Sequence, residues 1–323
     1  MWGYGTFGSK VPAMTRLRRG TVLVNPAARG VAKGFDGTRI TRYLARRGIE
    51  AGMVLPSSGA DATLNARESA ERGDDILFVV GGDGSVRDAA LGLAGSETAL
   101  AAVPAGTVNV WAREAGIPTG IRAAIDAHLD GQSVHMDMGR AGDHCFLLMA
   151  GVGWDAEIAS HVNPGLKRAT GDIAYLLQAA WMAPDLRSRR SRWTTPEAAF
   201  EEDLAWMVLG NTRLYGGRVH LTPGAVIDDG KLDVVALCPR GFGDRLRLAG
   251  KVVLGRQDDP RIMHLRTPEL TIETAGLPVQ LDGDYAGETP MRFCVDPGAL
   301  LVSVPGGPLA RIFAREHIDR RPG

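Results

Sequence analysis

The chain has 323 residues, 45% of them hydrophobic and 23% charged, which excludes a disordered or fibrous protein and allows two domains of ordinary size. Lys plus Arg equals Asp plus Glu at 37 each, so no overall field attracts nucleic acid and we expect no nucleic-acid partner. Three widely separated cysteines exclude a disulfide framework and fit a reducing cytosol.

Residues 1–19 mix glycine with apolar side chains and carry their charges last, the reverse of a signal peptide. We expect a poorly ordered tail there, or a true start at Met14. No apolar run approaches the ~18 residues that a membrane-spanning helix needs. These features predict a cytoplasmic protein that meets membranes only at their surface.

Between residues 20 and 134, β-branched runs alternate with segments of helical spacing. The expected strands are 21–26, 49–56, 75–80 and 99–106, and the expected helices are 35–48, 61–73, 85–95, 107–116 and 120–131. Asp61 is the expected cap of the second helix. The alternation is typical of βαβ units, so we predict an α/β domain with a parallel sheet and helices on both faces.

The pattern changes over residues 135–304. Strand-like segments are 134–141, 144–153, 204–211, 231–237, 270–276, 277–284, 291–296 and 299–304, with one clear helical passage at 170–183. We predict a second, mainly antiparallel β domain over residues 135–304. The last segment, 305–323, is expected to pack back on the first domain.

The strand at 75–80 ends in the turn Gly81-Gly82-Asp83-Gly84-Ser85. Successive glycines let backbone N–H groups point into one concavity, and the helix that follows adds its positive end, which together favour a phosphate. A carboxylate inside such a turn suggests an intervening Mg²⁺ at Asp83. The plain alternative is a strand-to-helix turn in which Asp83 or Ser85 caps the helix.

Two further loops follow expected strands: Asn25-Pro26, and Gly106-Thr107 with Asn109 just beyond. Ligands of parallel sheets bind at the carboxyl ends of strands, so we expect these loops to lie beside the glycine turn.

Five segments together resemble the diacylglycerol kinase catalytic-domain family, which includes bacterial lipid kinases and sphingosine kinases. They are NPAARG, GGDGS with PAGTVN, GVGWDAEI, YGGRVHLTPGAVIDDGKLDVV and VQLDGDYAG. The likeness runs from about Thr21 to Val304 in the family's motif order. GGDG alone is shared with NAD kinases. The resemblance implies that ATP and a lipid meet in a cleft between an α/β domain and a β-sandwich-like domain.

The resemblance also implies a set of ATP-contacting residues. They are Asn25, Pro26, Ser57, Gly81, Gly82, Asp83, Gly84, Ser85, Val86, Arg87, Asp88, Gly106, Thr107 and Asn109. This chain departs from the family at several of them. Ser57 stands near a position where threonine is frequent, Ser85, Arg87 and Asp88 replace Thr and Asn-Glu, and Val110 replaces an aspartate.

The segment VQLDGDYAG carries the predicted catalytic carboxylates of the second domain. Transfer of a phosphoryl group to a hydroxyl needs a base. The family usually has Asp-Gly-Glu here, with the third residue resembling the base, so we predict Asp284 as base. Asp282 would orient it or reach Mg²⁺, with Asp83 as the third catalytic carboxylate. The roles of Asp282 and Asp284 could be exchanged, and a simple hairpin turn is the alternative.

The turn before the strand at 231–237 contains Asp229. The resemblance implies a structural Mg²⁺ bound by the Asp229 side chain and the carbonyls of Val226 and Lys231, whereas the residues alone also fit a plain Asp-Asp-Gly turn.

Residues 175–193 combine aromatic and basic side chains, among them Trp181, Trp193 and Arg190. Such a mixture suits an anionic membrane surface. A core helix followed by a solvated loop is the alternative, and we favour it slightly.

These observations predict an ATP- and Mg²⁺-dependent lipid kinase that transfers the γ-phosphoryl group to a lipid hydroxyl, with diacylglycerol as first-choice acceptor. A NAD kinase and a non-catalytic nucleotide-binding regulator of the same fold are the alternatives. The acceptor lipid is left open by the sequence, as is a homodimer formed through an unpaired strand edge.

Overall fold

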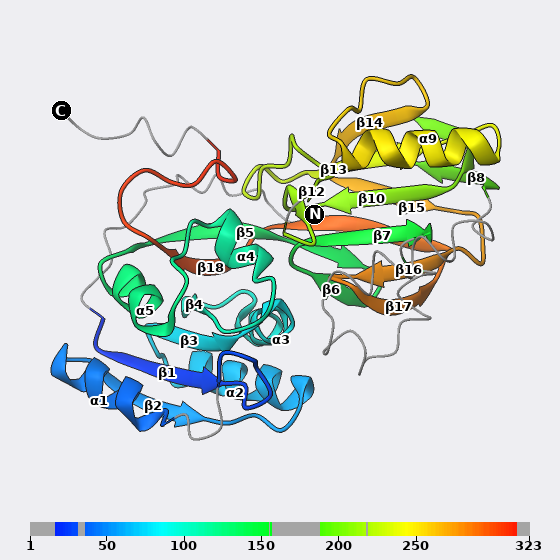
Figure 1. Cartoon of the computed structure of the whole chain (residues 1–323). Coiled ribbons are helices and arrows are strands. Elements are labelled where there is room, and N and C mark those ends of the chain that lie inside the picture. Colours follow the sequence, from blue (N-terminus) through cyan, green and yellow to red (C-terminus); the bar gives the residue numbers. More distant parts are fainter. Residues whose placement is uncertain (1–16, 32–35, 155, 157–187, 218, 315–323) are drawn as a thin grey trace, which may run out of the picture.

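The computed structural model describes residues 17–31, 36–154, 156, 188–217 and 219–314. Within them the chain forms two large sheets, with most helices packed around the N-terminal half of the first (Figure 1). The expected tail lies outside the described residues except at its end, where the backbone N–H groups of Arg18 and Arg19 donate to Asp75 and β1 begins.

Sheet A contains the predicted parallel sheet. Its path is β2-β1-β3-β4-β18-β15-β8-β9, with β5 and β6 attached through β18. The strands are β1 (Arg19–Val24), β2 (Glu50–Val54), β3 (Ile76–Gly81), β4 (Ala99–Pro104), β5 (Gln132–Ala141), β6 (His144–Phe146), β8 (Arg189–Thr194), β9 (Ala199–Leu204), β15 (Glu269–Ile272) and β18 (Met291–Val304). The first four pair in parallel, as predicted. All six residues of β3 are buried, as expected for a central parallel strand.

The helices of the N-terminal half follow its strands. They are α1 (Thr38–Arg46), α2 (Gly59–Glu71), α3 (Asp83–Leu93), α4 (Val110–Glu114) and α5 (Ile121–Leu129). The prediction that Asp61 caps α2 is wrong. The cap is Ser58, whose side chain accepts the N–H of Asp61, because the helix begins two residues earlier than expected.

Sheet B is antiparallel, as predicted for the second half, in the order β14-β13-β10-β7-β16-β17. Its strands are β7 (Met149–Gly153), β10 (Trp206–Gly210), β13 (Leu232–Leu237), β14 (Ile262–Thr267), β16 (Pro278–Leu281) and β17 (Asp284–Glu288), and β11 (Leu214–Tyr215) pairs separately with β12 (Val219–His220). Both faces are covered. Met207 and Leu209 join the hydrophobic core that sheet B shares with part of sheet A, whereas Val208 between them joins the other core.

Several elements of the second half differ from expectation, and strands β8, β9 and β14 were not expected at all. A helix, α9 (Phe242–Val253), packs on sheet B at a place where no helix was expected. The segments 291–296 and 299–304 form one strand, β18, whose register against β5 shifts between Asp296 and Leu300. The predicted helix at 170–183 lies outside the described residues.

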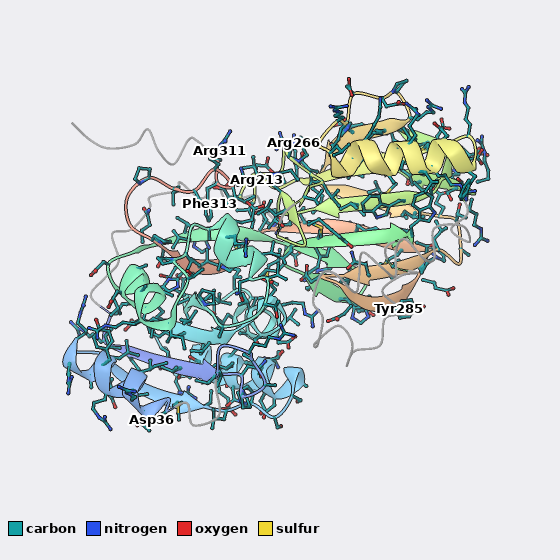
Figure 2. The ribbon with its side chains drawn as sticks, in the orientation of Figure 1. Asp36, Arg213, Arg266, Tyr285, Arg311 and Phe313 are labelled. Atoms are coloured by element: carbon teal, nitrogen blue, oxygen red, sulfur yellow. The ribbon has the colours of Figure 1, made fainter. Side chains whose placement is uncertain are left out.

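The residues after β18 return to the N-terminal half. Ile312 and Phe313 are buried, the Ile312 carbonyl accepts the N–H of Ile227, and the Phe313 ring lies edge-on to Trp111 (Figure 2). This short segment therefore contacts both α4 and the loop that leads to β13.

No helix among the described residues is long and apolar enough to cross a membrane. Of the expected membrane-facing segment, Trp181 and Met182 lie outside those residues. Trp193 is fully buried in β8 and stacks on Phe200, so it is neither a membrane-facing aromatic nor part of the solvated loop that we slightly favoured. The arginines beside it form ion pairs across the sheet, Arg190 with Glu201 and Arg192 with Glu273.

Candidate active site

The three predicted loops meet at the carboxyl ends of β1, β3 and β4. The N–H of Gly30 donates to the Ala105 carbonyl at 2.8 Å, and the N–H of Ala105 donates to Gly81 at 2.9 Å. A Cβ added at Gly106 would lie 2.6 Å from the Cα of Gly82, closer than real Cβ atoms approach. The loops can touch only because glycine stands there, which confirms that they share one edge of the sheet.

Asp83 has a structural partner that the sequence did not indicate. Its Oδ2 accepts the N–H of Val110 at 2.9 Å, and its Oδ1 accepts the N–H of Trp111 at 3.0 Å. The carboxylate therefore caps the start of α4 from the neighbouring loop. An acidic residue in this turn therefore needs no cation to be accommodated, because α4 supplies two donors. Magnesium ligation by Asp83 stays a prediction.

Side-chain amides hold the loops on either side of the glycine turn. The Asn25 side-chain amide donates to the Ser85 hydroxyl at 2.8 Å, and its Oδ1 accepts the N–H of Ala27. Asn109 adopts a left-handed conformation (φ 51°) and bonds the N–H and carbonyl of Gly106 through its own amide. Both asparagine side chains therefore form hydrogen bonds that order their own loops.

The other predicted ATP contacts divide into exposed and buried positions. Pro26, Gly84 and Thr107 are exposed around the junction of the loops. Val86 is buried, so its side chain belongs to the core and only its backbone is available to a ligand. Ser57 precedes α2 and gives its hydroxyl to Asp61 at 3.0 Å.

The beginning of α3 fits a phosphate. This helix has 11 residues, and a Cβ added at Gly84 in its first turn would meet nothing within 4 Å. The first-turn N–H groups of a helix have no partner inside it and carry the positive end of its dipole. An open, N–H-lined surface of this kind suits the phosphates of a nucleotide.

Asp282 fixes the β16–β17 hairpin to the start of β7. Its carboxylate accepts three backbone N–H groups, from Leu147 and Leu148 at 2.8 Å each and from Met149 at 3.0 Å. Its own N–H donates to the Met149 carbonyl at 3.0 Å. Burial raises the pKa of this carboxyl, and the three donors oppose that shift. Asp282 is thus a positioning residue for the hairpin.

Asp284, two residues later, reaches across to the first domain. Its Oδ2 accepts from the Arg87 guanidinium at 2.8 Å, while the same guanidinium contacts Asp88 Oδ1 at 3.1 Å. The Asp284 side chain is 62% exposed and Arg87 only 20%. Arg87 therefore joins the first turns of α3 to the hairpin that carries the predicted base, although 197 residues separate the two in sequence.

A second polar link joins the domains at the far end of α4. The buried Glu114 carboxylate accepts from the Arg213 guanidinium at 2.7 Å and from the backbone N–H groups of Arg213 and Leu214. The sequence alone gave no sign of this contact, because Glu114 looks like an ordinary exposed helix residue. With Asp83 at its other end, α4 is held from both sides.

An arginine from β14, Arg266, reaches the predicted structural metal turn. Asp229 Oδ1 accepts the N–H of Lys231 at 3.0 Å, and its Oδ2 is ion-paired with Arg266, which also contacts Asp233 at 3.0 Å. A cation at Asp229 would have to share the carboxylate with this guanidinium. Metal binding by Asp229 with the carbonyls of Val226 and Lys231 stays a prediction.

No group of three or more His, Cys, Asp or Glu side chains in the described parts of the chain is close enough together to hold a metal ion.

Sequence reasoning missed Asp137, whose side chain holds the turn that contains Asp229. This buried side chain accepts the N–H of Gly230 at 2.6 Å and that of Gly298 at 2.8 Å. Burial, with a smaller contribution from Asp228 and Asp229, raises its pKa to about 6. An aspartate between two methionines of β5, Met136 and Met138, was the signal that could have identified it.

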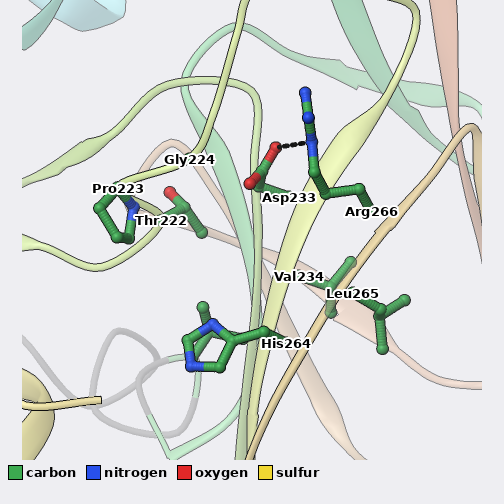
Figure 3. Close-up of a pocket in the computed structure, with 9 residues that line it drawn as sticks. Thr222, Pro223, Gly224, Asp233, Val234, His264, Leu265 and Arg266 are labelled. Carbon is green, nitrogen blue, oxygen red and sulfur yellow. Dashed lines mark hydrogen bonds and ion pairs between the residues drawn. The ribbon is translucent and has the colours of Figure 1, made fainter. Parts of the chain in front are cut away.

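A cavity of about 470 Å³ lies beside this turn, away from the three loops (Figure 3). Its walls are Thr222, Pro223, Gly224, Asp233, Val234, Val235, His264, Leu265 and Arg266. Asp233 and Arg266 neutralise each other within it, so its remaining surface is chiefly apolar.

Comparison with known families identifies the chain. A family model for the diacylglycerol kinase catalytic domain matches residues 19–141, and one for the YegS C-terminal NAD kinase beta sandwich-like domain matches residues 149–304. The chain belongs to the diacylglycerol kinase family. It is an enzyme, a lipid kinase of the YegS and diacylglycerol kinase type, and membership of this kinase family implies the use of ATP.

Individual relatives agree with this assignment. The protein called "Probable lipid kinase YegS-like" in Pseudomonas aeruginosa is 34% identical over 275 residues, covering 83% of this chain and 90% of its own length. The "Diacylglycerol kinase" of Bacillus subtilis is 26% identical over 282 residues, covering 86% and 93%. A crystal structure of a diacylglycerol kinase from Bacillus anthracis str. Sterne shares the fold, with TM-score 0.75, 24% identity, and coverage of 90% of this chain and 98% of that one. The NAD kinase and the non-catalytic regulator lose their support.

Proposed function

We propose that this lipid kinase transfers the γ-phosphoryl group of ATP to the free hydroxyl of diacylglycerol and so forms phosphatidic acid. The observation that carries the proposal is the Arg87–Asp284 contact, which brings the predicted base next to the helix start that suits a nucleotide phosphate. A relative of similar length bears the name diacylglycerol kinase, which supports this choice of acceptor.

In this proposal ATP lies with its phosphates at the start of α3, where the open space above Gly84 admits them. Asp284, exposed on the hairpin, takes the proton of the lipid hydroxyl as that oxygen attacks the γ-phosphorus and ADP leaves. Asp282 holds the hairpin in place through three backbone bonds. Because Asp282 is engaged in this way, Asp284 is the better base of the two.

Mg²⁺ would neutralise charge on the phosphates when bound with ATP. The carboxylates of Asp88 and Asp284 are oxygen donors of the type that Mg²⁺ prefers, and an ion bound there would have to share them with the Arg87 guanidinium.

The acceptor can be identified directly. Purified protein is incubated with γ-labelled ATP and Mg²⁺ and with mixed micelles that contain diacylglycerol, monoacylglycerol, a sphingoid base, phosphatidylglycerol or an isoprenoid alcohol, with NAD as a separate acceptor. We expect label in phosphatidic acid. Label in another phospholipid would replace diacylglycerol by that acceptor, and no transfer to any acceptor despite ATP binding would overturn the proposal.

A further inference from the structure

Three of the exposed side chains on α9 and its C-terminal cap are large and apolar. Phe242, Leu246 and Leu254 have 47%, 49% and 71% of their surface exposed. Steps of four residues through Gly250 connect them into a stripe that turns gradually around the helix, because four residues slightly exceed one helical turn. The opposite side is buried through Leu248 and Val252. An ordinary surface helix presents polar residues to solvent, so this arrangement needs an explanation.

Exposed apolar side chains are concentrated here. Among the described residues, six large hydrophobic side chains are exposed, and three of them belong to this one helix and its C-terminal cap. Single exposed leucines are common on soluble proteins, but a contiguous apolar stripe marks a surface that another body covers. We call these residues, Phe242, Leu246, Gly250 and Leu254, the α9 stripe.

Basic residues flank the α9 stripe. Between 240 and 261 the chain carries Arg240, Arg245, Arg247, Lys251, Arg256 and Arg261 against Asp244, Asp258 and Asp259, a net charge of +3 (six minus three) in a protein whose overall charge is zero. The Arg245 guanidinium lies 5.4 Å from the centre of the Phe242 ring, so cation and apolar group share one surface.

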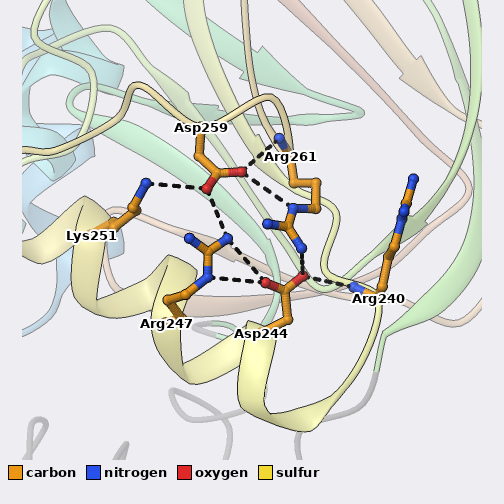
Figure 4. Close-up of polar contacts among 6 residues, drawn as sticks. All are labelled: Arg240, Asp244, Arg247, Lys251, Asp259 and Arg261. Atoms are coloured by element: carbon orange, nitrogen blue, oxygen red, sulfur yellow. Dashed lines mark hydrogen bonds and ion pairs between the residues drawn. The ribbon is translucent and has the colours of Figure 1, made fainter.

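An ion-pair network holds the helix rigidly against the chain that follows it (Figure 4). Asp259 accepts from Arg247 at 2.8 Å and Lys251 at 3.2 Å, and Asp244 accepts from Arg261 at 2.6 Å. The two acidic side chains are mostly buried, whereas Arg240 and Arg256 are exposed at the two ends of the helix. The stripe is thus a fixed surface with cations at its borders.

We propose that the α9 stripe docks this enzyme on an anionic phospholipid surface. The apolar side chains would enter the boundary between head groups and acyl chains, and the flanking cations would contact anionic head groups, the behaviour of an interfacial amphipathic helix. Charge complementarity selects this occupant over a neutral bilayer or an apolar protein groove. The inference uses the lipid-kinase assignment only in that a lipid kinase must reach a substrate held in a membrane.

Vesicle flotation tests the proposal. The full chain is mixed with vesicles of phosphatidylcholine alone or of phosphatidylcholine with phosphatidylglycerol, and the bound fraction is measured. We expect binding to the anionic vesicles that weakens with added salt. The double variant Leu246→Gln with Leu254→Gln should lower the partition coefficient about tenfold or more, because two apolar side chains no longer enter the lipid. Arg240→Gln with Arg256→Gln should weaken binding chiefly at low salt.

Matched controls come from the N-terminal half. Leu55 and Leu64 are exposed to a similar degree, 58% and 52%, so Leu55→Gln with Leu64→Gln should leave flotation unchanged. Arg39→Gln with Arg46→Gln removes the same charge from another exposed surface. The proposal would be overturned if the wild-type protein binds equally to vesicles with and without phosphatidylglycerol. It would also be overturned if the α9 variants bind vesicles to the same extent as the control variants.

A second copy of the chain is the competing occupant. Analytical ultracentrifugation distinguishes the two occupants. If the α9 stripe mediates self-association, the stripe variants will lose the dimer but keep vesicle binding, and that result would also overturn the proposal. Failure of the proposed diacylglycerol reaction would be seen separately in the micelle assay, which does not depend on vesicle binding.

Discussion

At the scale of single residues, Arg87 is the most informative departure from the family pattern. It stands where an asparagine is common, and its guanidinium bridges Asp88 and Asp284 from a mostly buried position. Exposed ion pairs contribute only about 0–1 kcal/mol to stability, and the Asp284 side of this pair is exposed. We therefore assign Arg87 a role in positioning the base and not in holding the fold.

Replacing Arg87 should slow turnover more than it weakens ATP binding. In Arg87→Ala we expect kcat to fall by roughly tenfold or more, because the hairpin carboxylate loses its orientation, while the KM for ATP changes little. Arg87→Lys should recover part of the rate. Arg67→Ala, an exposed arginine on α2, is the control. A rate for Arg87→Ala equal to that of the control would contradict this role.

His128 offers a test of the core by pH. It is fully buried, with Nε2 2.8 Å from the Ala102 carbonyl and Nδ1 3.0 Å from the Ser303 hydroxyl, and burial lowers its pKa to about 4. Because the unfolded chain binds a proton near pH 6.5 and the folded chain does not, stability is complete above that pH. It should be lost as the pH falls toward 4, by about 3 kcal/mol.

Urea denaturation between pH 4 and pH 7 checks this expectation. His128→Gln should be less stable than wild type at neutral pH but should lose most of the wild-type slope across this window. The exposed His144→Gln should keep the slope. If His128→Gln retains the wild-type slope, other groups carry the acid sensitivity.

At the scale of elements, α4 depends on its two carboxylates. Five residues are too few for an independent helix, and Asp83 and Glu114 supply contacts at its two ends. Asp83→Asn keeps the shape but turns a donor toward one of the two N–H groups, so the free energy of unfolding should fall by about 1–2 kcal/mol even without Mg²⁺. Chemical denaturation with excess chelator measures it, with Asp143→Asn, a change at an exposed position between β5 and β6, for comparison. Unchanged stability would leave Asp83 with a ligand role alone.

The elements also show what sequence could predict. Sequence patterns located the β1–β4 units because short apolar runs alternate with helical segments, and the three loops followed from the rule for parallel sheets. Helix α9 was missed because its exposed side is apolar and glycine interrupts it, so the helical period is hidden. Strand β8 was missed because its arginines suggested a solvated loop. Ser191 and Trp193, which alternate with them, are buried.

The site residues, too, could be predicted from the sequence only in part. Glycine turns and the Asp-Gly-Asp segment were visible as motifs, and the family resemblance supplied their roles. Their partners were not visible. The N–H groups that bind Asp83 come 27 and 28 residues later, and Arg87 lies 197 residues before Asp284. Contacts at such separations are fixed by the packing of the sheets, which local patterns do not encode.

At the scale of the whole molecule, two long strands unite the halves. β18 pairs with β15 in the second half, with β5 along most of its length, and with β4 at Val302. The same junction is crossed by the Arg87–Asp284 and Arg213–Glu114 contacts. The three loops at the ends of β1, β3 and β4 and the β16–β17 hairpin are therefore held in a fixed relative position. A reaction between a bound nucleotide and a second substrate requires such positioning.

The central claim is that Asp284 accepts the proton of a lipid hydroxyl while ATP is bound at the start of α3. The most direct measurement is the rate of labelled phosphate transfer to diacylglycerol in micelles for wild type and Asp284→Asn, with ATP affinity measured by titration on the same samples. We predict a loss of roughly 10²-fold or more in rate with nearly unchanged ATP affinity. A variant that phosphorylates diacylglycerol at the wild-type rate would contradict the account.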